Sequence, residues 1–169
     1  ITPIDNVIKT SKDVKVGAEL TSQYLPLIKG KSVAIVANQS SMIKNTHLVD
    51  SLLSIGIKIK KVFCPEHGFR GQVDAGKTVA TEKDHATGLT IITLYGKNKK
   101  PLPQDLANVD VVIFDIQDVG VRFYTYLSTL HYVMEACAEN KKLLIVLDRP
   151  NPHGYYMDGP LLEPSFKSF

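Results

Sequence analysis

The sequence predicts an α/β fold, a Rossmann-like parallel sheet with helices on both faces. Two observations support this prediction. Apolar runs of strand length alternate along the chain with segments whose apolar residues recur at helical spacing. Within the runs, successive positions are apolar rather than every second one, which is typical of strands that are buried on both faces of a parallel sheet.

Each expected strand has its own local signal. The run at 57–64 alternates before it turns apolar, the run at 89–96 is rich in β-branched residues and ends at a glycine, and the run at 109–116 is the most apolar. The five expected strands span 31–38, 57–64, 89–96, 109–116 and 141–148.

Two segments between the strands have helical spacing. In the first, Thr46 is placed to cap a helix that Gly56 ends, and the second spans 122–140. The connection from 64 to 89 is instead long, polar and rich in glycine. A loop of that length inside a compact domain more often has a function than not.

The composition excludes several classes of protein. The chain has 169 residues, of which 44% are hydrophobic and 22% charged, the balance of one globular domain. The net charge of +3 comes from scattered lysines, so no nucleic-acid partner is expected. No apolar run is long enough to span a membrane. The chain begins at Ile1 without a methionine, which fits either a removed signal segment or a trimmed chain.

The cysteines and histidines give no sign of a metal or a cofactor. Cys64 and Cys137 lie far apart and outside any ligand spacing, so we expect buried, inert thiols, with a catalytic Cys64 as the alternative. No two histidines stand at metal-ligand spacing, so no metal is expected. Ordinary or structural roles are expected for His47, His85, His131 and His153.

Polar residues follow all five expected strands at the same, carboxyl, end. Ligands bind at this edge of open parallel sheets because successive strand ends converge on one crevice, so we expect a functional site here. Asp148 and Arg149 precede two prolines that stiffen the loop, and a structural role explains this pair at least as well as a catalytic one. The strand-end residues are Asn38 and Gln39, Glu66 and His67, 95–97, Asp115 with Gln117 and Asp118, and 148–151.

The loop after the second strand contains a nucleotide-binding pattern. Residues 71–78, from Gly71 to Gly76-Lys77-Thr78, match G-x-x-x-x-G-K-[ST]. In a phosphate loop, an apolar strand runs directly into the first glycine and a helix begins at the lysine. Here six residues separate Cys64 from Gly71, and a poor helix-forming segment follows the pattern. A P-loop NTPase is therefore kept only as an alternative.

Glu66, in the same loop, is a candidate proton donor. Pro65 before it and Gly68 after it would hold the carboxyl group on a stiff support. The neighbouring phenylalanines can raise its pKa toward neutrality, as cleavage of a glycosidic bond requires. An ion pair with Arg70 that merely pins the loop is an equally good explanation.

The segment 114–126, "FDIQDVGVRFYTY", adds two carboxylates and an arginine. Asp115 and Asp118 are candidates for a base or a sugar ligand, although Asp118 is also well placed to cap the helix that follows. Arg122 offers a planar fork for a carboxylate or phosphate. Tyr124 opens an amphipathic helix, which favours packing over stacking on a sugar.

Four motifs stand in a fixed order along the chain: "PEHGFRG" (65–71), "LYGK" (94–97), "FDIQDVGVRFYTY" (114–126) and "LDRPNP" (147–152). Together they resemble those of one known family, the NamZ-type exo-β-N-acetylmuramidases, long catalogued as a domain of unknown function. The resemblance runs from about Gly30 to Leu162. It implies a periplasmic or secreted glycoside hydrolase that releases N-acetylmuramic acid from the non-reducing ends of peptidoglycan fragments during cell-wall recycling.

The resemblance also implies a two-domain protein, of which this chain is the N-terminal half. On that basis the chain divides into a leading extension with a helix (1–29), a Rossmann-like catalytic domain (30–162) and the start of a connection (163–169). The C-terminal domain would complete the cleft. A non-catalytic carbohydrate-binding domain is a further alternative.

The family motifs assign roles to individual residues. Glu66 matches the catalytic glutamate of the family. A muramic acid carries a lactyl carboxylate, which offers a partner to Arg70, Arg122 or Arg149. The catalytic candidates are Glu66, His67, Asp115 and Asp118, and the substrate-binding candidates are Asn38, Gln39, Arg70, Gln117, Arg122, Tyr124 and Arg149.

Overall fold

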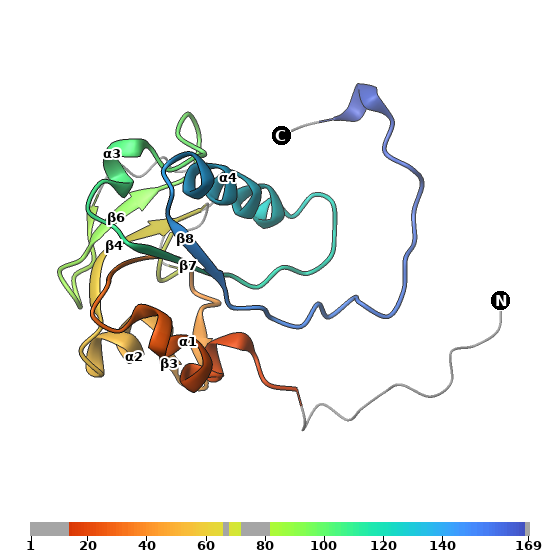
Figure 1. Ribbon diagram of the computed structural model, residues 1–169. Coiled ribbons are helices and arrows are strands. Elements are labelled where there is room, and N and C mark those ends of the chain that lie inside the picture. The colour runs from red at the N-terminus through yellow and green to blue at the C-terminus, as the bar shows by residue number, and fades with distance from the viewer. Residues whose placement is uncertain (1–13, 66–67, 72–81, 168–169) are drawn as a thin grey trace.

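The computed structural model describes residues 14–65, 68–71 and 82–167, and these contain a six-stranded sheet (Figure 1). The strands lie in the order β5-β6-β4-β1-β7-β8. Every neighbouring pair is parallel except β5 and β6, which are antiparallel. The bounds are β1 (Ser32–Ala37), β4 (Lys58–Cys64), β5 (Glu82–Lys83), β6 (Thr90–Thr93), β7 (Val111–Asp115) and β8 (Leu143–Val146).

The predicted α/β class and all five predicted strands are confirmed. If the five parallel strands are numbered along the chain, their order across the sheet is third, second, first, fourth, fifth, as in doubly wound sheets. The sequence did not predict β5 or the small hairpin of β2 (Met42–Ile43) and β3 (Thr46–His47). Each of these strands has two residues, too few for an apolar period to show.

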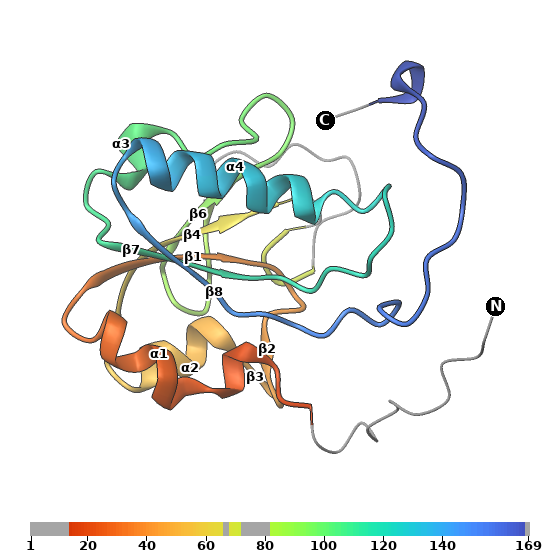
Figure 2. The same ribbon diagram turned by 45° about the vertical axis from the view of Figure 1, so that its right-hand side comes forward.

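Helices cover both faces of the sheet (Figures 1 and 2). The side chains of β1 alternate between two cores, with Val33 and Ile35 facing one and Ala34 and Val36 the other. This explains the unbroken apolar run, because both sets are buried. The first core includes α1 (Thr21–Ile28) and α2 (Leu48–Ser54), and the second includes α3 (Pro103–Leu106) and α4 (Tyr126–Glu139).

Two predicted helix starts are wrong. Thr46 lies in β3, and His47 caps α2 instead, because its ring Nδ1 accepts a hydrogen bond from the Val49 amide at 3.3 Å. The long helix begins at Tyr126 rather than at 122, since a turn at 121–124 precedes it. Asp118 therefore lies too far from the helix to cap it.

A short 3₁₀ turn, η1 (Gly17–Glu19), brings the segment before α1 onto the exit of β8. The Gly17 amide donates a hydrogen bond to the Asp148 carbonyl at 2.7 Å. A Cβ atom at this position would lie 2.7 Å from the Asp148 nitrogen, so only glycine allows the approach. The contact with Gly17 therefore supports the loop that carries Arg149.

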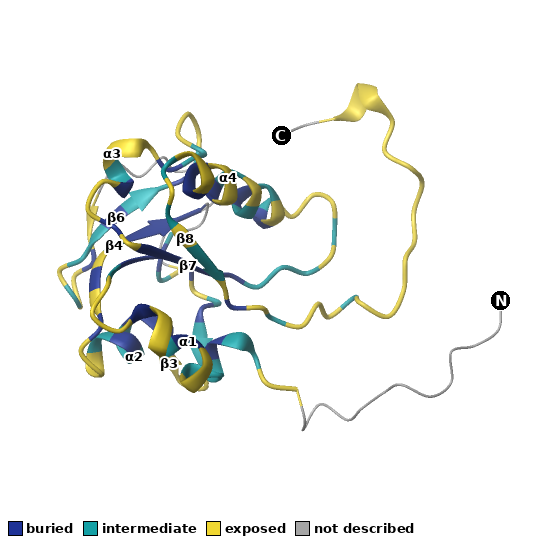
Figure 3. Ribbon diagram, in the orientation of Figure 1, coloured by how far each residue is buried: buried dark blue, intermediate teal, exposed yellow. Residues whose placement is uncertain are grey.

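After β8, the chain from 150 to 167 runs away from the sheet and ends in a second 3₁₀ turn, η2 (Pro164–Phe166) (Figures 1 and 3). Nearly all of this segment is exposed. Within the described ranges, no helix combines the length and the apolar composition needed to cross a bilayer.

Gly17→Ala should lower the free energy of unfolding by about 1–3 kcal/mol, because the new methyl group must displace backbone atoms of the β8 exit. Urea denaturation would measure this, with the exposed Lys15→Ala as the control. An unchanged denaturation midpoint for Gly17→Ala would contradict the proposed close contact.

Candidate functional site

The candidate site lies at the carboxyl ends of β1 and β7, which are neighbours in the sheet. The chain leaves β1 toward α2 on one face and leaves β7 toward α4 on the other face (Figure 2). A crevice opens between two strands whose connections diverge in this way, and it is the usual ligand site of such sheets. The strand-end residues predicted from the sequence therefore meet at a position suited to binding.

Asn38 and the two serines after it tie the end of β1 to the end of β7. The Asn38 side-chain oxygen accepts hydrogen bonds from the Ser40 amide at 2.8 Å and from its hydroxyl at 2.6 Å. The Ser41 hydroxyl donates to the Asp115 carbonyl, and the Ser40 hydroxyl accepts from the Gln117 amide at 3.0 Å. Asn38 is buried, and its oxygen shapes the loop in the structure.

His47 is a buried part of the site that the sequence analysis treated as ordinary. Its Nε2 lies 2.9 Å from the Asn38 carbonyl, and Nδ1 accepts from the Val49 amide. These partners select the neutral ring with the proton on Nε2. Burial lowers the His47 pKa, which also favours the neutral form. Its ring meets Phe69 edge-on at 4.7 Å, so it supports the loop after β4.

Asp115 and Arg149 form a buried ion pair. The guanidinium donates to both carboxylate oxygens, at 2.6 and 2.9 Å, and its Nη2 also donates to the Met42 carbonyl at 2.9 Å. The Asp115 side chain is 0% exposed and that of Arg149 is 7% exposed. Burial raises the Asp115 pKa, while the guanidinium opposes that rise. In this structure each group is the main partner of the other.

Arg70 is likewise held by carboxylates. Its guanidinium donates to Asp84 at 2.8 and 2.9 Å and to Asp50 at 2.9 and 3.0 Å, which uses four of its five N–H groups. Its hydrogen bonds lower the pKa of Asp84 to about 2. Phe69 lies under the guanidinium, 4.9 Å from its central carbon. Among the described residues, the ion pairs of Arg70 therefore join the loop after β4 to Asp50 in α2 and to Asp84 after β5.

Gln117 and Asp118 follow β7 at the same edge. The side-chain Nε2 of Gln117 donates to the Asp118 carbonyl at 2.7 Å and to the Pro150 carbonyl at 2.9 Å. The second of these bonds joins the loops after β7 and β8. The Asp118 Oδ2 atom accepts from the Gly120 amide at 2.9 Å. Its Oδ1 atom is buried and has no hydrogen-bond partner among the described residues. Asp118 also lines a cavity of about 170 Å³.

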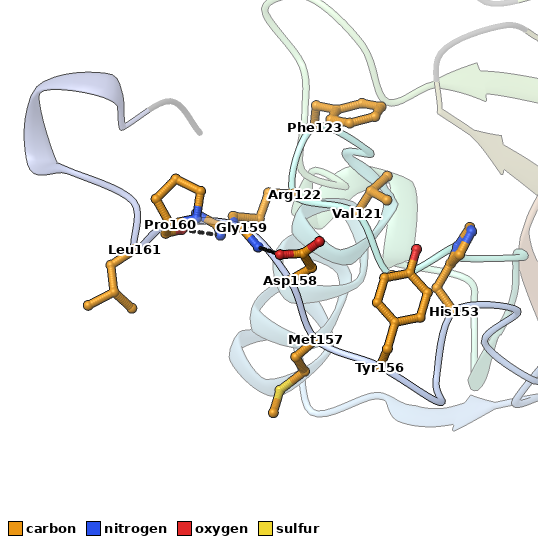
Figure 4. Close-up of a pocket in the computed structure, with 11 residues that line it drawn as sticks. Val121, Arg122, Phe123, His153, Tyr156, Met157, Asp158, Gly159, Pro160 and Leu161 are labelled. Carbon is orange, nitrogen blue, oxygen red and sulfur yellow. Dashed lines mark hydrogen bonds between the residues drawn. The ribbon is translucent and has the colours of Figure 1, made fainter. Parts of the chain in front are cut away.

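Arg122 and Tyr124 lie in the turn before α4. Tyr124 packs edge-on against Tyr126 with ring centroids 4.9 Å apart, as the helical pattern favours. The Arg122 guanidinium donates to the Pro160 carbonyl and lines a cavity of about 770 Å³ (Figure 4). The turn and the segment from 153 to 161 form the walls of that cavity.

Three of the predicted residues have few described contacts. Gln39 is exposed and lies beside Gly71, where a Cβ atom would come within 3.3 Å of the Gln39 Cβ. Glu66 and His67 lie outside the described residues, as do 72–78 of the nucleotide-binding pattern. The roles assigned to all these residues stay predictions.

The cysteines are buried thiols, as expected. Burial raises the pKa of Cys64 to about 12 and that of Cys137 to about 11, which disfavours a reactive thiolate. In the part of the chain that the structure describes, no three histidine, cysteine or acidic side chains gather as a metal site. The His153 Nδ1 donates a hydrogen bond to the Val119 carbonyl, 2.7 Å away, and the ring packs edge-on against Tyr156.

Asp84→Asn should lower the free energy of unfolding at pH 7 by about 2 kcal/mol, because the folded-state pKa of about 2 lies below the unfolded value of 3.8. The stabilisation is present above pH 4 and is lost as the pH falls through 2. Urea denaturation between pH 2 and 7 should show a flatter acid limb for the variant. A parallel acid limb, or the same change in a Glu19→Gln control, would contradict this.

Arg149→Met should destabilise the fold by about 3–5 kcal/mol, because it leaves the Asp115 carboxylate buried without its partner. The double variant Asp115→Leu with Arg149→Met removes both charges and should recover most of the loss. Urea denaturation of wild type, single and double variants measures this. A double variant as unstable as the single one would show that packing, not the charge pair, dominates.

The family model described as exo-beta-N-acetylmuramidase NamZ, N-terminal, matches residues 33–169. The peptidoglycan beta-N-acetylmuramidase NamZ of Bacillus subtilis (strain 168) is 44% identical over 173 residues, which cover 98% of this chain and 41% of that protein.

Two crystal structures of DUF1343 family proteins from Bacteroides fragilis NCTC 9343 have a similar fold. Their TM-scores are 0.77 and 0.79, at 42% and 39% identity, and they cover 90% and 91% of this chain. This chain spans 41% of the Bacillus relative and 39% of each Bacteroides chain. With a family match over most of its length, the chain belongs to the NamZ exo-β-N-acetylmuramidase family, as an N-terminal domain.

Proposed function

We propose that the protein carrying this chain is an exo-β-N-acetylmuramidase that releases N-acetylmuramic acid from the non-reducing ends of peptidoglycan fragments. The observation that carries this proposal is the 44% identity to a peptidoglycan beta-N-acetylmuramidase across 98% of the chain. A sheet edge that gathers carboxylates, amides and arginines supports it. The proposal includes a place outside the cytoplasm, where cell-wall fragments arise, and a role in their recycling.

We assign Glu66 as the general acid that protonates the leaving oxygen. It follows β4 directly after Pro65, and both flanks of the loop are held in place. Pro65 and Phe69 are buried, and Arg70 is fixed by two carboxylates. A catalytic acid needs such a fixed support, because proton transfer depends on placement at hydrogen-bond distance. His67, beside it, would line the same cleft.

We assign Asp118, rather than Asp115, as the second carboxyl group that a glycosidase requires. Asp115 is fully buried and shares both oxygens with Arg149, so it positions the loops. Asp118 keeps Oδ1 without a partner in the described structure, and a buried polar atom of that kind is rare in native proteins, which supports a role in binding or catalysis. Gln117, Gln39 and Asn38 lie at the same edge as candidate sugar contacts.

The phosphate-loop alternative receives no support from the residues around the pattern. In the described structure, Phe69 and Arg70 are packed and paired between the end of β4 and Gly71, so the strand does not run directly into the glycine. After the pattern, the described chain resumes at β5, a strand rather than a helix. Both features differ from a phosphate-binding loop.

We further propose that the region present in the longer relatives completes the substrate cleft. The segment 150–167 exposes several large apolar side chains, which soluble surfaces seldom gather without a partner. Covering them would also enclose the cavity beside Arg122. The exposed side chains include Tyr155 at 79%, Met157 at 100%, Leu161 at 94% and Phe166 at 73%.

Glu66→Gln should reduce kcat by about 10²–10⁴-fold, because the amide cannot protonate the leaving oxygen. The measurement is release of N-acetylmuramic acid by the full-length enzyme from a disaccharide that carries this sugar at its non-reducing end, because a sugar leaving group needs the proton. Asp118→Asn should lower kcat in the same assay while the thermal unfolding midpoint stays unchanged.

Lys77→Ala is the control for the phosphate-loop alternative and should keep wild-type activity. Addition of ATP and magnesium should not raise the melting temperature of the wild-type protein. If Glu66→Gln hydrolyses the muramide as fast as wild type, the assignment of the acid is wrong. If wild type releases nothing, a non-catalytic carbohydrate-binding domain becomes the better explanation.

A further inference from the structure

The chain has three arginines, and the structure uses them differently. Arg70 faces two carboxylates and Arg149 faces one, so the charges of both are compensated within the fold. Within the described part of the chain, the Arg122 side chain makes one hydrogen bond, to the neutral carbonyl of Pro160. Among the described residues, no carboxylate lies within ion-pair distance of Arg122. Most of its N–H groups therefore remain available to an incoming anion.

Arg122 also stands in the wall of a built cavity (Figure 4). The volume of about 770 Å³ lies within the range of small-molecule sites. Phe123 and Tyr156 add aromatic surface, and His153 adds an imidazole. Asp158, the acidic side chain of the lining, accepts from the Gly159 amide at 2.6 Å. Asp158 makes no described ion pair with Arg122, so the guanidinium, beside these aromatic rings, suits a ligand with an apolar face and a single negative charge.

The cavity wall is fixed to the loops that follow β7 and β8. Gly120, with φ of 72°, donates to the Asp118 carboxylate at 2.9 Å. A Cβ atom on Gly120 would lie 2.7 Å from the Asn151 side-chain oxygen, so the turn and the loop after β8 are in close contact. Since the His153 ring also bonds to the Val119 carbonyl at 2.7 Å, both sides of the cavity are held together. The turn that carries Arg122 is thus tied to Asp118 through the Gly120 amide.

Arg122 is held in place by the segment that passes over it. Its Nη2 donates to the Pro160 carbonyl, and a Cβ on Gly159 would lie 3.6 Å from the same nitrogen. Because Gly159 has φ of 91°, the backbone at this point takes a conformation that favours glycine. A long side chain fixed at one nitrogen loses less entropy when it binds a carboxylate with the others.

We propose that Arg122 binds the lactyl carboxylate of N-acetylmuramic acid, so that this cavity distinguishes muramic acid from N-acetylglucosamine. This inference rests on the function proposed above and names the group that selects its substrate. N-acetylglucosamine is the same sugar without the lactyl ether, so it offers the arginine no anion. The discrimination is then a charge-assisted pair that one sugar can make and the other cannot.

The test measures binding of both sugars to the full-length enzyme by calorimetry. Wild type should bind N-acetylmuramic acid more tightly than N-acetylglucosamine. Arg122→Gln should weaken binding of the acid by about tenfold to hundredfold and leave N-acetylglucosamine unchanged. The methyl ester of the lactyl group should bind wild type and Arg122→Gln equally, because the charge is already gone. In turnover, the variant should raise KM while kcat changes little.

Lys31→Gln removes an exposed charge at the opposite edge of the sheet and should change nothing. Arg122→Lys keeps the charge without the fork and should fall between wild type and Arg122→Gln. Equal loss of both sugars, or unchanged binding of the acid by Arg122→Gln, would overturn the inference. Because binding and hydrolysis are measured separately, a wild type that selects the acid through Arg122 without hydrolysing it would overturn only the proposed function.

Discussion

The buried pair of Asp115 and Arg149 is the interaction on which the rest of the site depends. It joins the end of β7 to the loop after β8, and the Arg149 bond to the Met42 carbonyl adds the segment after β1. Because both groups are almost fully buried, neither can turn to water if the other is removed. Three loops at the ligand edge therefore keep one relative position.

A second carboxylate–arginine cluster has the same role on the other side of the edge. Arg70, with Asp50 and Asp84, holds the loop that follows β4, while the neutral His47 supports the adjacent Phe69. The three arginines that were candidates for substrate binding therefore differ in how the structure uses them. Two arginines maintain the geometry of the site, and the third, Arg122, lines a cavity, where we propose that it binds the substrate carboxylate.

Much of the fold could be predicted because its signals are local. Strands such as β1 and β7 are buried on both faces, so their apolar runs are continuous and stand out in the sequence. The start of α4 was predicted too early because the apolar spacing continues through a turn that only backbone hydrogen bonds reveal. The two-residue strands had no detectable period.

By itself, the sequence determined the α/β class, the edge where polar residues gather and, through its motifs, the family. These follow from the apolar period, the succession of strands along the chain and the identities of residues, all of which can be read from the sequence. Only the tertiary structure decided which charges are already paired. Asp115 meets Arg149 across 34 positions and Arg70 meets Asp50 across 20, and no local pattern encodes such partners. Pairing depends on how the strands are ordered in space, and that order determines which arginine is left for a ligand.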